Sequence, residues 1–403
     1  MQRRTLIKAS LAGVALGLPA IHRVKADTVG VTATEIKIGQ TQAYSGPVSQ
    51  YGNIGRTQTA FFKMINDQGG IGGRKINFMS ADDGYQPPKT VEQTRRLVEQ
   101  ENVAFMFNSL GTPTNSAVHR YLNQKKVPQL FVATGADKWG NPKEFPWTMG
   151  WQPSYRIEAQ IYAKYILDQK PNAKIGIIYQ NDDFGKDYVL GAKDVLGAKF
   201  DSMVKTVSYE ATDATIDSQL VTLQGDGVDT LIGALIPKFA AMSIRKTFDM
   251  GWKPLFLLSN VSLSVGAVIN PAGPEKAVGI VSADFRKDAV DPLWKDDAGM
   301  NAWRAFMKQH MPDADISDNN YSYGYATSLT LMQVLKQCGN DLSRENVMRE
   351  AANLKDLENP ILLPGIKINT SPTNFRPITQ MQLQKWNGKS WELFGKIIGS
   401  TET

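Results

Sequence analysis

The chain has 403 residues, 21% of them charged, and its 45 basic and 39 acidic residues give a formal net charge of +6. Five of the basic residues and none of the acidic ones lie in residues 1–26, so residues 27–403 are nearly neutral, with 40 basic and 39 acidic residues. This balance, with no basic tract among aromatics, excludes a nucleic-acid binder, and a single cysteine and three scattered histidines exclude a disulfide framework and a metal cluster.

The first 26 residues have the pattern of a signal peptide. Arg3 and Arg4 precede a small, apolar run at residues 9–21, and Val24-Lys25-Ala26 is a small-x-small pattern suited to signal peptidase. The run is too short to span about 30 Å of hydrocarbon. The twin arginines fit export of a folded chain, and an ordinary Sec signal is the alternative. No cysteine follows the run, so a soluble, periplasmic protein is expected to start near Asp27.

Strands and helices alternate through the first part of the chain. Continuous apolar strands separated by helices predict a parallel sheet covered on both faces. One strand is expected to begin at residue 36, and three more are expected at 76–79, 103–107 and 127–133. Helices are expected around 59–65 and at 89–101 and 115–125.

The same alternation starts again after residue 150. Two similar runs predict an α/β protein with two doubly wound lobes. The expected helices lie at 154–169, 187–196, 216–224 and 238–250, and the expected strands at 174–179, 203–209, 230–235 and 255–259.

After residue 282 the pattern changes. Three helices are expected at 297–310, 319–337 and 343–354, and Cys338 is expected to be a buried apolar residue near a helix end. The tail at 380–397 alternates apolar and polar residues around Asn387-Gly388, which predicts a hairpin folded back onto one lobe.

Candidate binding residues stand at the carboxyl ends of the expected strands, where open α/β sheets bind ligands. Two loops, 108–114 and 132–136, are small and rich in hydroxyls, and a helix follows the first of them. Backbone amides and threonine hydroxyls in such turns make a neutral cradle for a carboxylate, although ordinary turn and capping chemistry would give the same composition.

The strand ends of the second half are more apolar and aromatic. Phe184, Ile236 and Asn260 follow three of these strands, and Tyr321, Tyr323 and Tyr325 alternate at the start of a helix, so they cannot all face one way. A pocket with one carboxylate-holding side and one aromatic side suits a small organic acid.

Catalytic signals are weak. The chain has no Gly-x-Ser-x-Gly elbow and no phosphate loop, and the glycines at 70–73 follow an expected helix, so a tight turn into a strand is favoured. The pairs Asp82-Asp83 and Asp182-Asp183 could do acid/base work, but neighbouring side chains do not converge, and solvation or capping is favoured. No cofactor is expected.

The motifs together resemble one known family. Tyr44-Ser45-Gly46-Pro47 with Gln50-Tyr51-Gly52, the glycines at 69–73, and Asp183-Phe184-Gly185-Lys186-Asp187 resemble the leucine/isoleucine/valine-type periplasmic binding proteins of ABC transporters. The resemblance implies two Rossmann-like lobes joined by three crossing segments that close on a ligand. It also implies a monomer that delivers a small-molecule ligand to a membrane permease.

The resemblance also implies how the chain divides into lobes. Residues 1–26 would be the signal peptide. The first lobe would comprise 27–150 with about 283–360, and the second 151–282 with about 361–403. Hinges would lie near residues 150, 280 and 360.

Site residues follow from the same resemblance. The carboxylate loops would be Leu110-Gly111-Thr112 and Ala133-Thr134-Gly135. The aromatic residues of the cleft would be Tyr51, Phe184 and either Tyr321 or Tyr323, and Ile236 and Asn260 join them at the strand ends.

One departure from the family concerns the ligand. Amino-acid binders of this family place a glutamate where Asn260 stands, and no acid lies between Phe256 and Pro274. A buried ammonium without a counter-charge costs several kcal/mol. We therefore predict an aromatic or branched aliphatic carboxylate without an α-ammonium. A hydrophobic amino acid, a role as a ligand sensor, and an enzyme with a converging nucleophile or acid/base pair are the alternatives.

Overall fold

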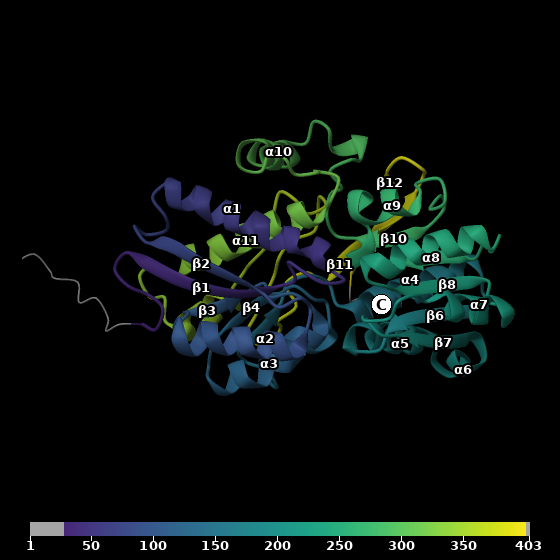
Figure 1. The fold of residues 1–403 in the computed structure, drawn as a ribbon, viewed down its shortest axis with the longest axis horizontal. Helices are drawn as coiled ribbons and strands as arrows, with labels where there is room; N and C mark the ends of the chain where they lie inside the picture. The colour runs from purple at the N-terminus through teal and green to yellow at the C-terminus, as the bar shows by residue number, and fades with distance from the viewer. Residues whose placement is uncertain (1–27, 400–403) are drawn as a thin grey trace, which may run out of the picture.

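The computed structural model describes residues 28–399, which form two α/β lobes (Figure 1). The predicted signal peptide over residues 1–26 and the predicted start at Asp27 lie outside the described residues. Within residues 28–399, no helix combines the length and the apolar character needed to cross a bilayer.

The first lobe is built on a parallel five-stranded sheet in the order β2-β1-β3-β4-β5. Helices α1 and α11 cover one face of it, and α2 and α3 cover the other (Figure 1). The elements are β1 (Glu35–Gln42), α1 (Gly52–Asp67), β2 (Lys75–Asp82), α2 (Pro87–Arg95), β3 (Phe105–Phe107), α3 (Thr112–Gln124), β4 (Gln129–Val132) and β5 (Thr148–Gly150).

The second lobe is built on a seven-stranded sheet in the order β12-β11-β10-β9-β8-β6-β7, parallel except where β11 pairs with β10 and β12. Its elements are α4 (Tyr155–Gln169), β6 (Ile175–Gln180), α5 (Asp183–Leu196), α6 (Phe200–Met203), β7 (Val204–Tyr209), α7 (Asp217–Gly225), β8 (Thr230–Ala234), α8 (Pro237–Asp249), β9 (Leu255–Leu258), α9 (Asn270–Ala272), β10 (Val281–Asp284), β11 (Gln380–Trp386) and β12 (Trp391–Gly399).

Three helices lie between β10 and β11: α10 (Ala298–His310), α11 (Asn320–Cys338) and α12 (Arg344–Ala351). Of these, α11 packs on α1, so the chain returns to the first lobe after β10 and reaches the second sheet again at β11. With the passage between β5 and α4, the chain crosses between the lobes three times. Short 3-10 helices lie at Ser49–Tyr51, Asp137–Gly140, Gly197–Lys199, Asn260–Ser262 and Pro292–Trp294, and π-helical turns at Arg96–Gln100 and Val265–Ile269.

The predicted α/β fold with two doubly wound lobes is confirmed. The predicted hairpin is confirmed as well, because β11 and β12 pair antiparallel and add to the second sheet. Two predicted strands are shorter than expected, since β3 begins at Phe105 and β4 ends at Val132. Beyond these ends a single bridge, between Leu110 and Ala133, continues the pairing into the loops.

Helix α1 begins seven residues before the predicted start at residue 59, because two glycines hide its first turn. A Cβ on Gly55 would lie 2.2 Å from the Tyr44 hydroxyl, so glycine is required where this turn approaches the neighbouring loop. The glycines after α1 behave as predicted. Gly70, Gly72 and Gly73 have positive φ and make the turn into β2.

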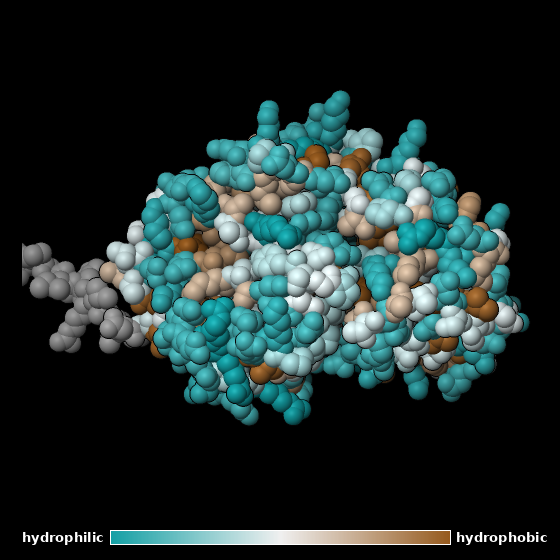
Figure 2. Space-filling model, viewed as in Figure 1, coloured by the Kyte–Doolittle hydropathy of each residue, from teal (hydrophilic) through white to brown (hydrophobic). Residues whose placement is uncertain are grey.

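The acidic pairs cap loops and helices, as predicted. Asp82 accepts hydrogen bonds from the backbone of Tyr44, Ser45 and Gly84, and Asp182 caps α5 through the amides of Phe184 and Gly185. On the face shown in Figure 2 the surface is mostly hydrophilic, with small, separate hydrophobic patches.

Candidate functional site

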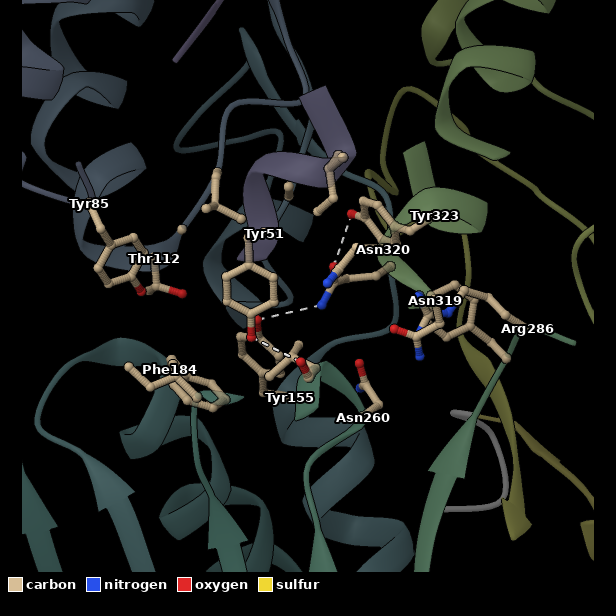
Figure 3. Close-up of a pocket in the computed structure, with 18 residues that line it drawn as sticks. Tyr51, Tyr85, Thr112, Tyr155, Phe184, Asn260, Arg286, Asn319, Asn320 and Tyr323 are labelled. Carbon is tan, nitrogen blue, oxygen red and sulfur yellow. Dashed lines mark hydrogen bonds between the residues drawn. The ribbon is translucent and has the colours of Figure 1, made fainter. Parts of the chain in front are cut away.

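A pocket lies between the two lobes, at the carboxyl ends of strands from both sheets (Figure 3). It holds about 600 Å³ of empty space, part of it open to solvent. The described residues that line it are Tyr51, Ile54, Tyr85, Leu110, Gly111, Thr112, Ala133, Gln152, Tyr155, Phe184, Ile236, Asn260, Val261, Phe285, Arg286, Asn319, Asn320 and Tyr323.

The structure brings nine of the twelve predicted site residues together in this pocket and leaves three outside it. The nine are Tyr51, Leu110, Gly111, Thr112, Ala133, Phe184, Ile236, Asn260 and Tyr323. Thr134 and Gly135 line a smaller neighbouring cavity, and Tyr321 is buried away from the pocket.

Thr134 and Gly135 support the pocket wall from behind. The hydroxyl of Thr134 is 2.6 Å from that of Thr112, and the carbonyl of Gly135 accepts a hydrogen bond from the Tyr155 amide at 2.8 Å. A side chain at Gly135 would meet the Pro153 carbonyl at 2.5 Å. The second predicted carboxylate loop therefore reaches the pocket only through Ala133, because Thr134 already turns its hydroxyl toward Thr112.

The loop before α3 is shaped by Gly111. Its φ of 95° lies in the left-handed region, and a Cβ there would meet the Tyr85 ring at 2.4 Å. Its amide donates to the carbonyl of Ala133, which joins the two loops side by side. Helix α3 then starts at Thr112, and the first amides of a helix have no partner inside it. Because Pro113 has no N–H, the amides of Thr112 and Thr114 are the ones that this helix start could offer to an acceptor group in the pocket.

Six helices of the described chain begin at this pocket. A residue at the cap or in the first turn lines it in α1 (Tyr51 and Ile54), α3 (Gly111 and Thr112), α4 (Tyr155), α5 (Phe184), α8 (Ile236) and α11 (Asn319 and Asn320). Each helix N-terminus carries about half a positive charge from its aligned peptide dipoles. Asp182 already caps α5, and Asp318 accepts a hydrogen bond from the Asn320 amide at the start of α11, so the other four N-termini are the ones that make the pocket favourable for an anion.

Aromatic rings make the middle of the pocket. Tyr51 projects from the start of α1 between the lobes, above Tyr155 and Phe184 (Figure 3). The Tyr155 and Phe184 rings meet edge to face with centroids 4.7 Å apart. The Tyr51 hydroxyl donates to the Val261 carbonyl at 2.9 Å, which ties the first lobe to the second. This wall suits an apolar ligand body.

Asn260 follows β9 and is held by a buried acid. Its backbone amide donates to Glu158 Oε1 at 2.8 Å, and its side-chain nitrogen donates to Glu158 Oε2. The side-chain amide oxygen is left facing the pocket (Figure 3). Burial raises the pKa of Glu158 to about 7, although hydrogen bonds from Tyr162, Asn260 and Tyr188 favour its charged form. The pocket is therefore lined at this point by a neutral acceptor, the side-chain oxygen of Asn260, and the Glu158 carboxyl lies behind it.

Arg286 is the one charged side chain among the described residues of the lining. It follows β10, is 6% exposed, and forms a salt bridge with Asp284 at 3.1 Å. Its guanidinium also stands over the rings of Phe285 and Tyr323, with 5.0 and 5.6 Å to their centroids.

Nine lining residues were not predicted from the sequence, and they fall into three groups. Tyr85 and Arg286 follow strands β2 and β10, so the rule of strand ends could have found them. Gln152 and Tyr155 follow β5, whose three residues give no strand signal. The others are Ile54, Val261, Phe285, Asn319 and Asn320, which depend on how neighbouring segments pack.

The lobes also touch around the rim of the pocket. Asp187 on α5 accepts a hydrogen bond from the Asp137 amide at 2.7 Å, and Lys138 pairs with Asp183 at 2.7 Å. Burial raises the pKa of Asp187 to about 7, with smaller contributions from the charges of Asp137 and Asp183. On another side, the Ser264 hydroxyl donates to Asp318 at 3.0 Å. These contacts hold the two lobes together around the pocket. Residues 28–399 contain no group of three or more His, Cys, Asp or Glu that could hold a metal ion.

Comparison with known proteins gives consistent results. The family model described as periplasmic binding protein matches residues 35–390. A relative in Brucella abortus, Leu/Ile/Val-binding protein homolog 7, is 22% identical over 275 residues, which is 64% of this chain and 67% of that protein.

Two solved structures share the fold. One is a branched chain amino acid ABC transporter protein from Thermus thermophilus with bound valine, with a TM-score of 0.81 and 16% identity, covering 92% of this chain and 97% of the other. The second is a fatty acid ABC transporter substrate-binding protein from Thermomonospora curvata, with a TM-score of 0.78 and 21% identity, covering 93% and 94%.

Proposed function

Because the chain belongs to the periplasmic binding protein family and has its type I fold, we propose that it is the solute-binding component of an ABC transporter and captures a small organic carboxylate. In this proposal the protein is periplasmic and monomeric and passes its ligand to a membrane permease. The solved relatives from Thermus thermophilus and Thermomonospora curvata, described as ABC transporter proteins, support the transport role.

The main support for a carboxylate ligand is the charge of the pocket. Six helix N-termini and Arg286 face it, and the described lining contains no Asp or Glu. The partial charges of the helices and the orphan amides at the start of α3 stabilise an anion. The aromatic wall of Tyr51, Tyr155 and Phe184 would hold the apolar body of an aromatic or branched aliphatic acid.

The same lining favours binding over catalysis. The described lining offers the Thr112 hydroxyl, but no histidine, carboxylate or lysine stands beside it as a base. The hydroxyl instead pairs with that of Thr134 at 2.6 Å.

The proposed mechanism is closure of the lobes around the ligand. The three crossings, after β5, after β10 and before β11, are the proposed hinges. A ligand that contacts both lobes stabilises the closed arrangement, and contacts such as that of Tyr51 with Val261 add to it.

A hydrophobic amino acid is the second candidate, and Asn260 is the observation that favours it. Its amide oxygen faces the pocket and could accept a hydrogen bond from an ammonium, with Glu158 behind it. The Thermus thermophilus relative, described with bound valine, points the same way. We favour the plain carboxylate because no acid in the described lining would contact the ammonium directly, and burying an uncompensated charge costs several kcal/mol.

Matched ligand pairs test this choice. Calorimetry would compare 4-methylpentanoate with leucine and 3-phenylpropanoate with phenylalanine, since each pair differs only by the ammonium group. We expect the acid without the ammonium to bind at least tenfold more tightly in at least one pair. Tighter binding of the amino acid in both pairs would show that Asn260 and Glu158 together accept an ammonium.

A further inference from the structure

The salt bridge in the pocket leaves one edge of Arg286 unused. Arg286 Nε and Nη2 donate to the two carboxylate oxygens of Asp284, each at 3.1 Å. A guanidinium has five N–H donors, and this side-on pair takes two of them. Nη1 has no hydrogen bond to a described residue, and Nη2 uses one of its two N–H groups in the salt bridge, so the end-on edge formed by Nη1 and the second N–H of Nη2 is left on a side chain that lines the pocket.

The orientation of this edge is fixed. Asp284 also accepts hydrogen bonds from the backbone amides of Phe285 at 2.7 Å and Arg286 at 3.1 Å, so its carboxylate is held in place. The rings of Phe285 and Tyr323 flank the guanidinium. An arginine edge held in one plane matches the two oxygens of a carboxylate.

Arg286 and the α3 loop are separate places in the pocket. Figure 3 shows Thr112 on one side of Tyr51 and Arg286 on the other. The start of α3 lines one side of the pocket, through Gly111 and Thr112, and Arg286 lines the other. Between them stand the aromatic residues. The lining therefore offers two sites for an anionic group, separated by an apolar wall.

We propose that the ligand is a dicarboxylate, with one carboxylate at the start of α3 and the second bound end-on to Nη1 and Nη2 of Arg286. This inference rests on the proposed function, because it extends the captured carboxylate to one that is ionised at both ends. Asp284 neutralises and orients the arginine without occupying the edge that the ligand uses.

Pairs of acids of matched length test the proposal. Calorimetry would compare terephthalate with 4-methylbenzoate and adipate with hexanoate at pH 7, where every carboxylate is ionised. A second bidentate, charge-assisted contact is expected to tighten the Kd at least tenfold in one of the pairs. If neither dicarboxylate binds more tightly than its monocarboxylate, the second site does not exist.

A double variant then ties the gain to Arg286. Asp284→Asn with Arg286→Gln removes both charges together, because removing one alone would leave a buried charge without its partner. The matched control is Lys287→Gln with Asp297→Asn, which removes a neighbouring ion pair, 2.7 Å apart, between a buried lysine and a partly exposed aspartate that do not line the pocket. The ratio of the two Kd values should fall to about one in the first variant and stay at its original value in the control.

The possible failures are distinguishable. Equal weakening of both acids by the double variant would place the single carboxylate of the ligand on Arg286 and overturn the dicarboxylate. If no carboxylate binds while leucine or phenylalanine does, the proposed function fails and the dicarboxylate fails with it. Thermal unfolding of every variant shows that a lost affinity is not a lost fold.

Discussion

Replacing Tyr51 with phenylalanine removes one hydroxyl that joins the lobes across the pocket. This hydroxyl donates to the Val261 carbonyl of the second lobe at 2.9 Å, while the ring stays in the pocket wall. Because the ring is kept, the shape of the pocket is unchanged and the substitution affects only the hydrogen bond. If closure brings these two groups together, the bond contributes to ligand affinity only in the closed arrangement.

The size of the effect follows from the usual value of such a bond. A net hydrogen bond contributes about 0.5–1.5 kcal/mol, since both groups are hydrated when they separate. Tyr51→Phe should therefore weaken the Kd of a bound carboxylate about two- to twelvefold. Most of the change should be in the dissociation rate, as is usual for variants of one site.

Calorimetry with 3-phenylpropanoate or 4-methylpentanoate measures the effect, and Tyr44→Phe is the matched control. The Tyr44 hydroxyl is 2.6 Å from that of Ser80, and both residues belong to the first lobe. The control should lower stability by a similar amount and leave the Kd unchanged. An unchanged Kd in Tyr51→Phe, or an equal loss in both variants, would refute the role of this contact in closure.

Three further predictions concern stability and reactivity. Burial raises the pKa of Asp187 to about 7, so the folded state keeps a proton that the unfolded state releases, and this stabilisation is present below pH 4 and lost as the pH rises through 7. Chemical denaturation should show Asp187→Asn gaining stability over the wild type between pH 4 and pH 8, by at most about 4 kcal/mol, and an equal difference at both pH values would contradict this. Gly324→Ala should lower stability by about 1–3 kcal/mol, because its Cβ would lie 2.6 Å from the Ile54 carbonyl. The control Gly225→Ala should not lower stability in this way, because its Cβ would meet nothing within 4 Å. Equal thermal shifts in the two variants would argue against the close approach of α1 and α11. Burial raises the pKa of Cys338 to about 12, so this thiol should react with a maleimide only after unfolding, and rapid labelling of the native protein would show that it is accessible.

Much of the fold could be predicted because its signals are local. Apolar strands separated by amphipathic helices gave the two lobes, and Asn387-Gly388 gave the hairpin. The missed start of α1 had a different cause. Gly55 disfavours a helix by its own propensity, and its role becomes visible only when the Tyr44 hydroxyl is seen 2.2 Å from where a Cβ would lie.

The candidate site was predictable where it follows continuous apolar runs in the sequence. Gly111, Phe184 and Asn260 stand after such runs or at the helices that follow them, and all three line the pocket. Glu158 could not be placed from the sequence, because it lies about 100 positions before Asn260 and reaches it only through the packing of α4.

Glu158 changes what the departure at Asn260 means. The sequence shows that no acid stands in the loop after β9, and the structure places one directly behind it. A ligand without an ammonium is therefore favoured because the amide oxygen of Asn260 faces the pocket and no carboxylate does. The comparison of acids with amino acids tests this point.

The central claim is that the pocket captures an organic anion. The most direct measurement is a calorimetric titration with 3-phenylpropanoate and 4-methylpentanoate, each beside its neutral carboxamide of nearly the same shape. The helix N-termini that carry no acidic cap, together with Arg286, predict one site per chain and at least tenfold tighter binding of one of the acids than of its amide. Equal or tighter binding of both amides would contradict the capture of an anion.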